Sequence, residues 1–452
     1  MVASPRPGAA RERLSVTSSA TPTVVRAIGR LSLAGLVLNS IVGTGVFVLP
    51  GTVGRALGWP VMYAWVAAAA ASAVMIFCFA EVASRFTQAG GAYLYGKVAF
   101  GPFAGIQLAW LSYLVRCLTA AVQANLFTTY LAELWPGAAA RPVEVAVTAA
   151  FIGVHALVNV RGVGTGAKVS DVFAIVKILP LAAFGVLGIL WLALGRAAAP
   201  AIASDPTLDG WLSSVVLLMF AYGGFESALI PAAEAKDARR DAPFALLVGL
   251  ALATLVYLAA QLAVLATLTE PAATDRPLAA SARVMLGTPG AVAITLAALL
   301  SVYGWMASNM LNVPRLTMAM AERGDLPAWF GKVHPRFRTP WISILLFAAV
   351  SLALALQAGL LENLSLSAVS RLLLYGSVCA ALPVFRARER RGVRADGVHE
   401  ALFPVRGGVA LAVIGVALSL VLVTRMNARE GLTMALTAAL AALHWSLVRK
   451  EK

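Results

Sequence analysis

The stretch Ser40-Ile41-Val42-Gly43-Thr44-Gly45-Val46-Phe47 lies in the middle of residues 29–54, a segment that is otherwise apolar enough to cross a lipid bilayer. Two glycines this close together favour a break in a membrane helix. Lipid cannot hydrogen-bond free amide and carbonyl groups, so a break survives only where protein or a water-filled cavity satisfies them. The stretch therefore predicts a discontinuous helix that borders a cavity inside the membrane.

The composition is typical of a polytopic membrane protein. Of the 452 residues, 60% are hydrophobic and only 13% are charged, and the mean hydropathy is +0.83, which excludes an ordinary soluble chain. A spanning helix needs about 20 apolar residues. We expect an all-α protein with twelve transmembrane helices. The candidate spans are residues 29–54, 61–85, 101–134, 143–160, 169–194, 211–235, 242–268, 289–321, 340–357, 366–386, 407–424 and 431–448.

Basic residues predict the orientation of these spans. Lysine and arginine in short loops stay on the cytoplasmic side, and most of the 36 in this chain fall in inner segments if the amino terminus is inside. We therefore expect a multi-pass protein of the cytoplasmic membrane with both termini cytoplasmic. Residues 1–28 are expected to be a disordered cytoplasmic tail. Anionic membrane lipid explains the net charge of +15, so no nucleic-acid partner is expected.

A second glycine pair occurs in the sixth span, in Phe220-Ala221-Tyr222-Gly223-Gly224-Phe225-Glu226-Ser227. Taken alone, either pair could simply allow two helices to pack closely. Their equivalent positions instead indicate an internal repeat, residues 29–194 and 211–386, followed by two accessory spans in residues 407–448. Five crossings per half make the second half inverted relative to the first.

The ends of a broken helix predict what the cavity holds. Free amides of Thr44, Gly45 and Val46 carry a partial positive charge that suits a carboxylate. Carbonyls left unpaired near Ile41 and Phe220 suit an ammonium group. The two breaks together predict a site for a zwitterion.

The chain resembles the amino acid-polyamine-organocation (APC) superfamily of amino acid transporters and permeases. The resemblance runs from about residue 29 to residue 386, and the order and spacing of its motifs make it specific. These motifs are Gly43-Thr44-Gly45; Phe79-Ala80-Glu81-Val82-Ala83-Ser84-Arg85-Phe86 with Ala89-Gly90-Gly91-Ala92-Tyr93; Phe100-Gly101-Pro102-Phe103-Ala104-Gly105; Glu234-Ala235-Lys236-Asp237-Ala238-Arg239-Arg240-Asp241-Ala242-Pro243; and Ala319-Met320-Ala321-Glu322-Arg323-Gly324-Asp325-Leu326-Pro327 with His334-Pro335-Arg336-Phe337-Arg338-Thr339-Pro340.

The resemblance implies an APC/LeuT-like fold, in which two inverted repeats of five helices surround one substrate site and helices 1 and 6 are discontinuous. It also implies transport by alternating access. The first glycine motif would bind the substrate carboxylate, and the unwound parts of both helices would bind the amino group. The substrate-binding residues that this implies are Ile41, Gly43, Thr44, Gly45, Val46, Phe220, Tyr222, Gly223 and Gly224.

Two ionisable residues inside the predicted spans are candidates for proton coupling. Glu226 follows the second break by one turn, and the resemblance implies that a carboxylate there takes part in proton coupling. Alternatively, Glu226 has a structural role as a partner for neighbouring backbone or for Arg116. Lys177 lies about 12 Å from the cytoplasmic end of its span at 1.5 Å per residue. It either reaches back to the headgroups or, as the resemblance implies, replaces the coupling sodium of other relatives and exchanges a proton.

Arg116 departs from the resemblance, because relatives have a small or apolar residue at this position. It continues a polar stripe of Ser112, Thr119 and Gln123 at helical spacing, which should face the cavity. Three roles are open: a charge partner for Glu226, a clamp for a substrate with an extra carboxylate, or a packing residue bonded to unwound backbone. A cationic substrate is disfavoured because like charges repel in a low-dielectric pocket.

The other polar residues of the spans receive no functional assignment. Arg371 is expected near the outer end of its span, with its side chain reaching the interface, and Arg315 is also expected to be structural. Neither the cysteines nor the histidines have metal-ligand spacing, and we expect no disulfide, metal or cofactor. These residues are Cys78, Cys117, Cys379, His155, His334, His399 and His444.

The function expected from the sequence is secondary active transport of small amino acids by proton-coupled symport, driven by a proton gradient and without sodium. The alternative is an amino acid antiporter or exchanger, including one for an acidic or otherwise carboxylate-bearing substrate. A non-transporting sensor or regulatory membrane protein is the alternative from another class. An enzyme is not expected, because the sequence shows no nucleophile paired with a general base. Partners are the small-molecule substrate and membrane lipids; the sequence leaves the oligomeric state open.

Overall fold

The computed structural model describes most of the chain, and the predicted tail, residues 1–28, lies outside the described residues. Within the described part every regular element is a helix. The described residues are 29–86, 91–162, 167–198, 207–228, 237–271, 273–393 and 397–450, with side chains undescribed at 167–176, 228, 238 and 448–450.

The helices follow the predicted spans closely. In chain order they are α1 (Arg30–Ile41), α2 (Gly45–Leu57), α3 (Val61–Ala83), α4 (Gly91–Phe100), α5 (Pro102–Leu134), η1 (Pro136–Ala139), α6 (Arg141–Val160), α7 (Ala167–Ala193), α8 (Leu208–Tyr222), α9 (Phe225–Ala228), α10 (Ala238–Thr267), α11 (Pro277–Glu322), η3 (Ala328–Gly331), α12 (Trp341–Gln357), α13 (Leu360–Arg390), α14 (Gly408–Val423) and α15 (Ala428–Lys450).

The first predicted span is broken where its glycines lie. Helix α1 ends at Ile41 and α2 begins at Gly45, and the two are bent by 48°. In the sixth span α8 ends at Tyr222, and the left-handed φ of +103° at Gly224 separates it from α9. Only glycine adopts this conformation readily.

The two breaks lie directly against each other. A Cβ atom on Gly224 would lie 2.3 Å from the carbonyl oxygen of Ser40, and one on Gly45 would lie 2.8 Å from the Cβ of Ala221. These glycines therefore allow the breaks and also let the broken helices pack closely. The two explanations of the glycine pairs, a helix break and close helix packing, both apply. Gly43 has no such neighbour, because its added Cβ would meet only the Ile41 carbonyl at 3.7 Å.

The prediction of an all-helical multi-pass protein is confirmed, whereas the count of twelve spans stays a prediction. Seven helices of the described part are long and apolar enough to cross a membrane, or eight if the bent pair α1 and α2 counts as one span. The described part of α7, α12 and α14 are shorter apolar helices. The inverted repeat boundaries also stay predictions.

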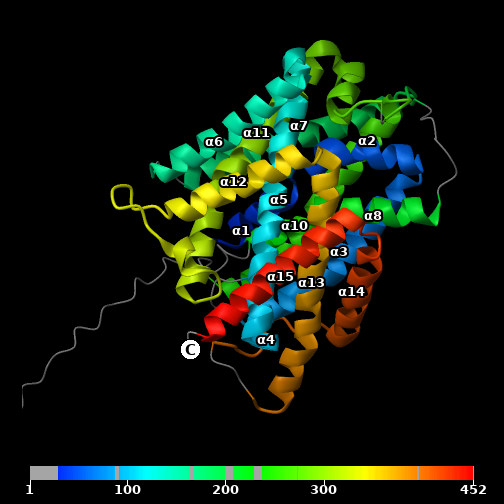
Figure 1. Cartoon of the computed structure of the whole chain (residues 1–452). Helices are drawn as coiled ribbons and strands as arrows, with labels where there is room; N and C mark the ends of the chain where they lie inside the picture. Colours follow the sequence, from blue (N-terminus) through cyan, green and yellow to red (C-terminus); the bar gives the residue numbers. More distant parts are fainter. Residues whose placement is uncertain are drawn as a thin grey trace, which may run out of the picture.

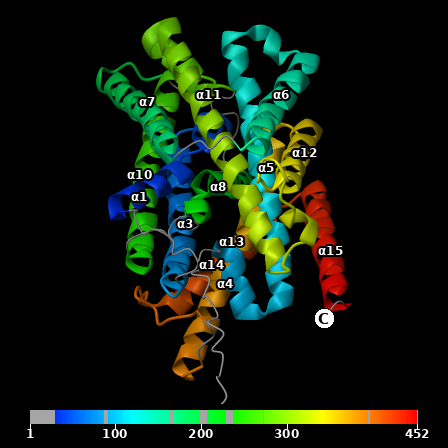
Figure 2. The same cartoon turned by 90° about the vertical axis from the view of Figure 1, so that its left-hand side faces the viewer.

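The helices form one elongated bundle (Figure 1). Helices α1 and α10 lie side by side, α10 also contacts α3 and α7, and α5 runs between α11 and α13. Helix α14 packs on α13 and α3, and α15 lies along α5 at the edge of the bundle (Figure 2). This peripheral position fits the accessory role expected for residues 407–448.

Ion pairs join the segments at the end of the bundle that carries α4, which we call the α4 end. Lys97 on α4 pairs with Asp325 at 2.6 Å, and the Tyr93 hydroxyl donates to the same carboxylate at 3.1 Å. Burial raises the pKa of Tyr93, so the phenol keeps its proton. Nearby, Arg386 pairs with the fully buried Glu81 at 2.5 Å. These contacts join α4 to the loop after α11 and join α3 to α13, and the sequence predicts that this end is cytoplasmic.

Candidate functional site

The carbonyl ends at the two breaks are already hydrogen-bonded, which corrects the expectation that they are free. The hydroxyl oxygen of Tyr257, on α10, lies 2.8 Å from the carbonyl oxygens of both Ile41 and Ala221. The carbonyl of Phe220 accepts from the amide of Gly223 at 3.0 Å. One tyrosine therefore joins both broken helices, and a substrate ammonium group has to compete with it.

The amide end of the first break fits the expected carboxylate site. The amides of Thr44, Gly45 and Val46 have no acceptor within the described residues, as expected for the first turn of α2. The Thr44 hydroxyl is also buried and has no hydrogen-bond partner among the described residues. Buried donors that lack acceptors are costly, so this end of α2 is suited to an anionic group.

Lys177 reaches the first break instead of the membrane surface. Its side chain is only 3% exposed, and its Nζ donates to the carbonyl of Asn39, in the last turn of α1, at 2.7 Å. A carbonyl at this position has no amide partner in its own helix. Lys177 therefore caps the carboxyl end of α1, where the helix dipole favours a positive charge.

Glu226 is the centre of a buried polar network. Its Oε1 accepts from Arg371 at 2.8 Å, and its Oε2 accepts from the Tyr375 hydroxyl at 2.6 Å and the Gly224 amide at 2.9 Å. The side chains of Glu226 and Arg371 are each 7% exposed. The network therefore links the second break to α13.

The interfacial position expected for Arg371 is wrong. The residue lies about 17 Å into α13 at 1.5 Å per residue, and it is buried. Its guanidinium donates to Thr119 on α5 at 2.9 Å and lies 5.6 Å from the centre of the Phe220 ring. A Cβ on Gly223 would lie 2.6 Å from its Nη1, so the glycine leaves the room that this arginine fills.

Arg116 approaches the same region from α5 but does not pair with Glu226. Its Nη1 donates to the Ser227 hydroxyl on α9 at 2.9 Å, and within the described residues its side chain forms no ion pair. The role of charge partner thus belongs to Arg371. The predicted polar stripe does face the centre, since Ser112 lies beside Arg116 and Thr119 contacts Arg371.

A pocket of about 20 Å³ lies beside Arg116 and Glu226. Its walls come from α4, α5, α9, α11 and α13, so it lies between the second break and the α4 end. A volume of this size holds about one water molecule. Its lining residues are Gly91, Ala92, Tyr93, Ser112, Val115, Arg116, Glu226, Leu316, Met320 and Leu374.

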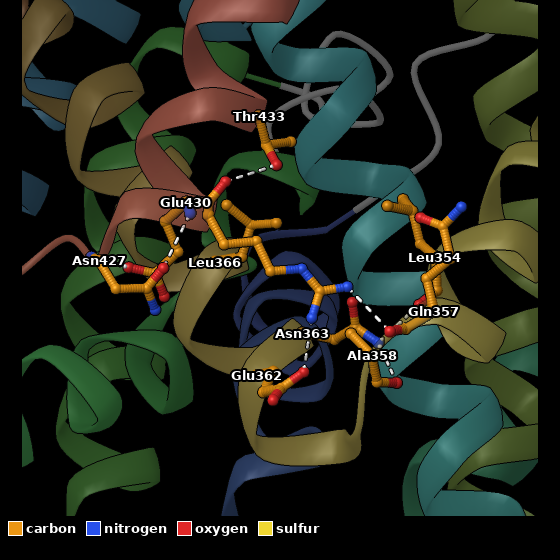
Figure 3. Close-up of a pocket in the computed structure, with 10 residues that line it drawn as sticks. Leu354, Gln357, Ala358, Glu362, Asn363, Leu366, Asn427, Glu430 and Thr433 are labelled. Atoms are coloured by element: carbon orange, nitrogen blue, oxygen red, sulfur yellow. Dashed lines mark hydrogen bonds and ion pairs between the residues drawn. The ribbon is translucent and has the colours of Figure 1, made fainter.

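A pocket of about 300 Å³ lies elsewhere, between the end of α12 and the starts of α13 and α15 (Figure 3). Across it Arg429 pairs with Glu362 at 2.9 Å and donates to the Gln357 carbonyl at 2.8 Å. None of its lining residues belongs to α1, α2, α8 or α9, so this pocket is separate from the two breaks.

The remaining predicted residues are close to the breaks and buried. Tyr222 donates to the Trp65 carbonyl at 3.3 Å, and its ring packs on Tyr257. Sequence reasoning missed Tyr257, Tyr375 and the buried position of Arg371. The helical spacing of Arg371 and Tyr375, four residues apart, was the one available signal, because it puts both side chains on one face.

A family model described as amino acid permease matches residues 28–440. The chain belongs to this family. It is therefore a multi-pass membrane transporter by family, not an enzyme. The resemblance to the APC superfamily inferred from the sequence motifs is confirmed.

Characterised relatives of the chain are transporters. The serine/threonine exchanger SteT of Bacillus subtilis is 27% identical over 85% of this chain and 88% of its own. The large neutral amino acids transporter small subunit 2 of Mus musculus is 28% identical over 73% of this chain and 64% of its own. Among solved structures, Mhp1, a nucleobase-cation-symport-1 family transporter, matches with a TM-score of 0.57 at 17% identity, over 94% of both chains. This last likeness shows the fold alone.

Proposed function

We propose that this protein is a secondary transporter of small amino acids in the cytoplasmic membrane, working by alternating access and coupled to protons. The observation that carries the proposal is the juxtaposition of two broken helices. The unpaired amides at Thr44, Gly45 and Val46 supply a carboxylate site, and the buried Glu226 and Arg371 pair adjoins the second break.

Proton coupling is supported by the surroundings of Lys177. Its ammonium group contacts a neutral carbonyl and, within the described residues, no carboxylate. Losing its proton therefore breaks no ion pair there. The same ammonium group supplies a positive charge at the carboxyl end of α1, in the place that a coupling sodium ion would otherwise take. This supports coupling to protons and not to sodium.

Exchange of two amino acids is the second candidate, because the relative SteT is named an exchanger. In this case movement of one substrate outward drives the other inward, and neither a proton nor a sodium gradient is needed. The arrangement of the breaks is equally suited to both cycles.

The test is transport by the purified full chain in proteoliposomes. Uptake of a panel of labelled amino acids is measured with and without a pH gradient, with and without sodium, and with or without unlabelled amino acid inside. Symport predicts accumulation that follows the pH gradient, whereas exchange predicts uptake that requires internal substrate. Absence of both for every amino acid would overturn the proposal.

Lys177→Met tests the coupling residue. We expect it to abolish accumulation driven by the pH gradient while equilibrium exchange persists. Lys332→Met is the matched control, because Lys332 is an exposed lysine in the connecting segment that follows η3. Sodium dependence of the native protein would contradict the role given to Lys177.

A further inference from the structure

The centre of the transporter carries more positive than negative charge. Arg116 and Arg371 approach the second break from α5 and α13, and Glu226 is the one carboxylate that either arginine contacts within the described residues. Arg371 takes this carboxylate. Among the described residues, the hydrogen-bond partner of Arg116 is the neutral Ser227 hydroxyl, at 2.9 Å.

Both guanidinium groups retain unused donors. The Nε atoms of Arg116 and Arg371 are buried and have no hydrogen-bond partner in the part of the chain that the structure describes. A buried guanidinium is costly unless a charge and several acceptors compensate it, and its planar fork is matched best by a carboxylate. The arrangement therefore lacks one anionic acceptor.

The position of the arginines places this acceptor next to the expected substrate. Arg371 lies directly against Gly223, and the second break lies against the first through Gly224 and Ser40. Arg116 also lines the pocket beside Glu226. A molecule with one carboxylate at the start of α2 and a second at the arginines would have to lie across the contact between the breaks, which is closed by close packing in this conformation.

Charge balance distinguishes the possible substrates. A neutral zwitterion leaves the net single positive charge of Arg116, Arg371 and Glu226 uncompensated in a region of low dielectric constant. A substrate with a second carboxylate cancels it. We infer that the two arginines form an anion subsite, so that the preferred substrate is an amino acid with a carboxylate side chain.

This inference rests on the proposed function and adds the substrate class. In the conformation seen here the pocket holds about one water molecule, so the carboxylate enters when the helices around it separate. Arg116, which has no carboxylate partner within the described residues, then pairs with the substrate carboxylate while Arg371 keeps Glu226, so that the charges of the two arginines, Glu226 and the substrate side chain balance.

The experiment compares acids with their amides, which have nearly the same shape. Aspartate against asparagine, and glutamate against glutamine, compete for uptake into proteoliposomes that contain the native full chain. We expect at least tenfold preference for the acid. Transport of amino acids with no preference for the acids would overturn this inference and leave the proposed function intact, whereas no transport of any amino acid would overturn the proposed function.

Variants then locate the preference. Arg116→Gln should lower the acid-to-amide preference at least tenfold, because it replaces a charge-assisted hydrogen bond to the substrate carboxylate by a weaker neutral one. Arg116→Lys should retain part of it. Arg315→Gln, at an exposed arginine on α11, is the matched control and should leave it unchanged.

A second measurement separates binding from transport. Aspartate should raise the melting temperature of the detergent-purified native protein more than asparagine does, and Arg116→Gln should remove this difference while the protein remains monodisperse. An unchanged preference in a folded Arg116→Gln variant would overturn the anion subsite. If that variant does not fold, the comparison of acids with amides in the native protein still decides whether acidic amino acids are preferred.

Discussion

The ion pair between Glu226 and Arg371 makes a strong prediction about stability. Arg371→Met removes the guanidinium but keeps a long side chain on α13. It leaves Glu226, whose side chain is 7% exposed, with only Tyr375 at 2.6 Å and the Gly224 amide at 2.9 Å. Removing one partner of a buried pair costs about 3–5 kcal/mol. Since two hydrogen bonds persist, we expect a loss near the lower limit, about 3 kcal/mol.

A double-mutant cycle separates the pair from other effects of the substitution. Glu226→Gln alone leaves Arg371 buried and unpaired, so it is also expected to destabilise. Combined with Arg371→Met it removes the second charge, and the double variant should recover about 2 kcal/mol relative to the sum of the single losses, within the range measured for residues in contact.

The assay is the free energy of unfolding of the four purified proteins in mixed micelles with increasing SDS. Arg429→Met is the matched control, because its ion pair with Glu362 has a similar length, 2.9 Å, but side chains that are 53% and 63% exposed. Such a pair contributes less than about 1 kcal/mol. Losses that add to within about 0.5 kcal/mol, or equal losses at Arg371 and Arg429, would refute the reasoning.

Two further predictions concern the breaks themselves. Gly45→Ala should strongly reduce transport, because the added Cβ would lie 2.8 Å from the Cβ of Ala221. Gly43→Ala is the control: it has no such clash and keeps its amide, so its effect on transport should be far smaller. Equal uptake rates of the two variants would contradict this. Tyr257→Phe leaves two carbonyls without their donor, so the free energy of unfolding should fall by about 1–3 kcal/mol, and Tyr63→Phe, at a 73% exposed tyrosine, should change it little.

Much of the architecture could be predicted because its causes are local. Both breaks follow from glycine pairs within apolar segments, and the long helices lie on predicted spans, whereas α4 lies between two of them. The expected free carbonyls were wrong for a different reason. Tyr257 is 216 residues from Ile41 in sequence, and no local pattern indicates which helix face the tyrosine presents to the breaks.

The sequence by itself determined the membrane class, the family and the two broken helices, since hydropathy and backbone freedom depend on short stretches of chain. Only the tertiary structure decided which charges meet. Glu226 pairs with Arg371 and not with Arg116, and Lys177 reaches α1 and not the headgroups. Ion pairing between helices depends on their relative depth and rotation, which are set by packing of the whole bundle.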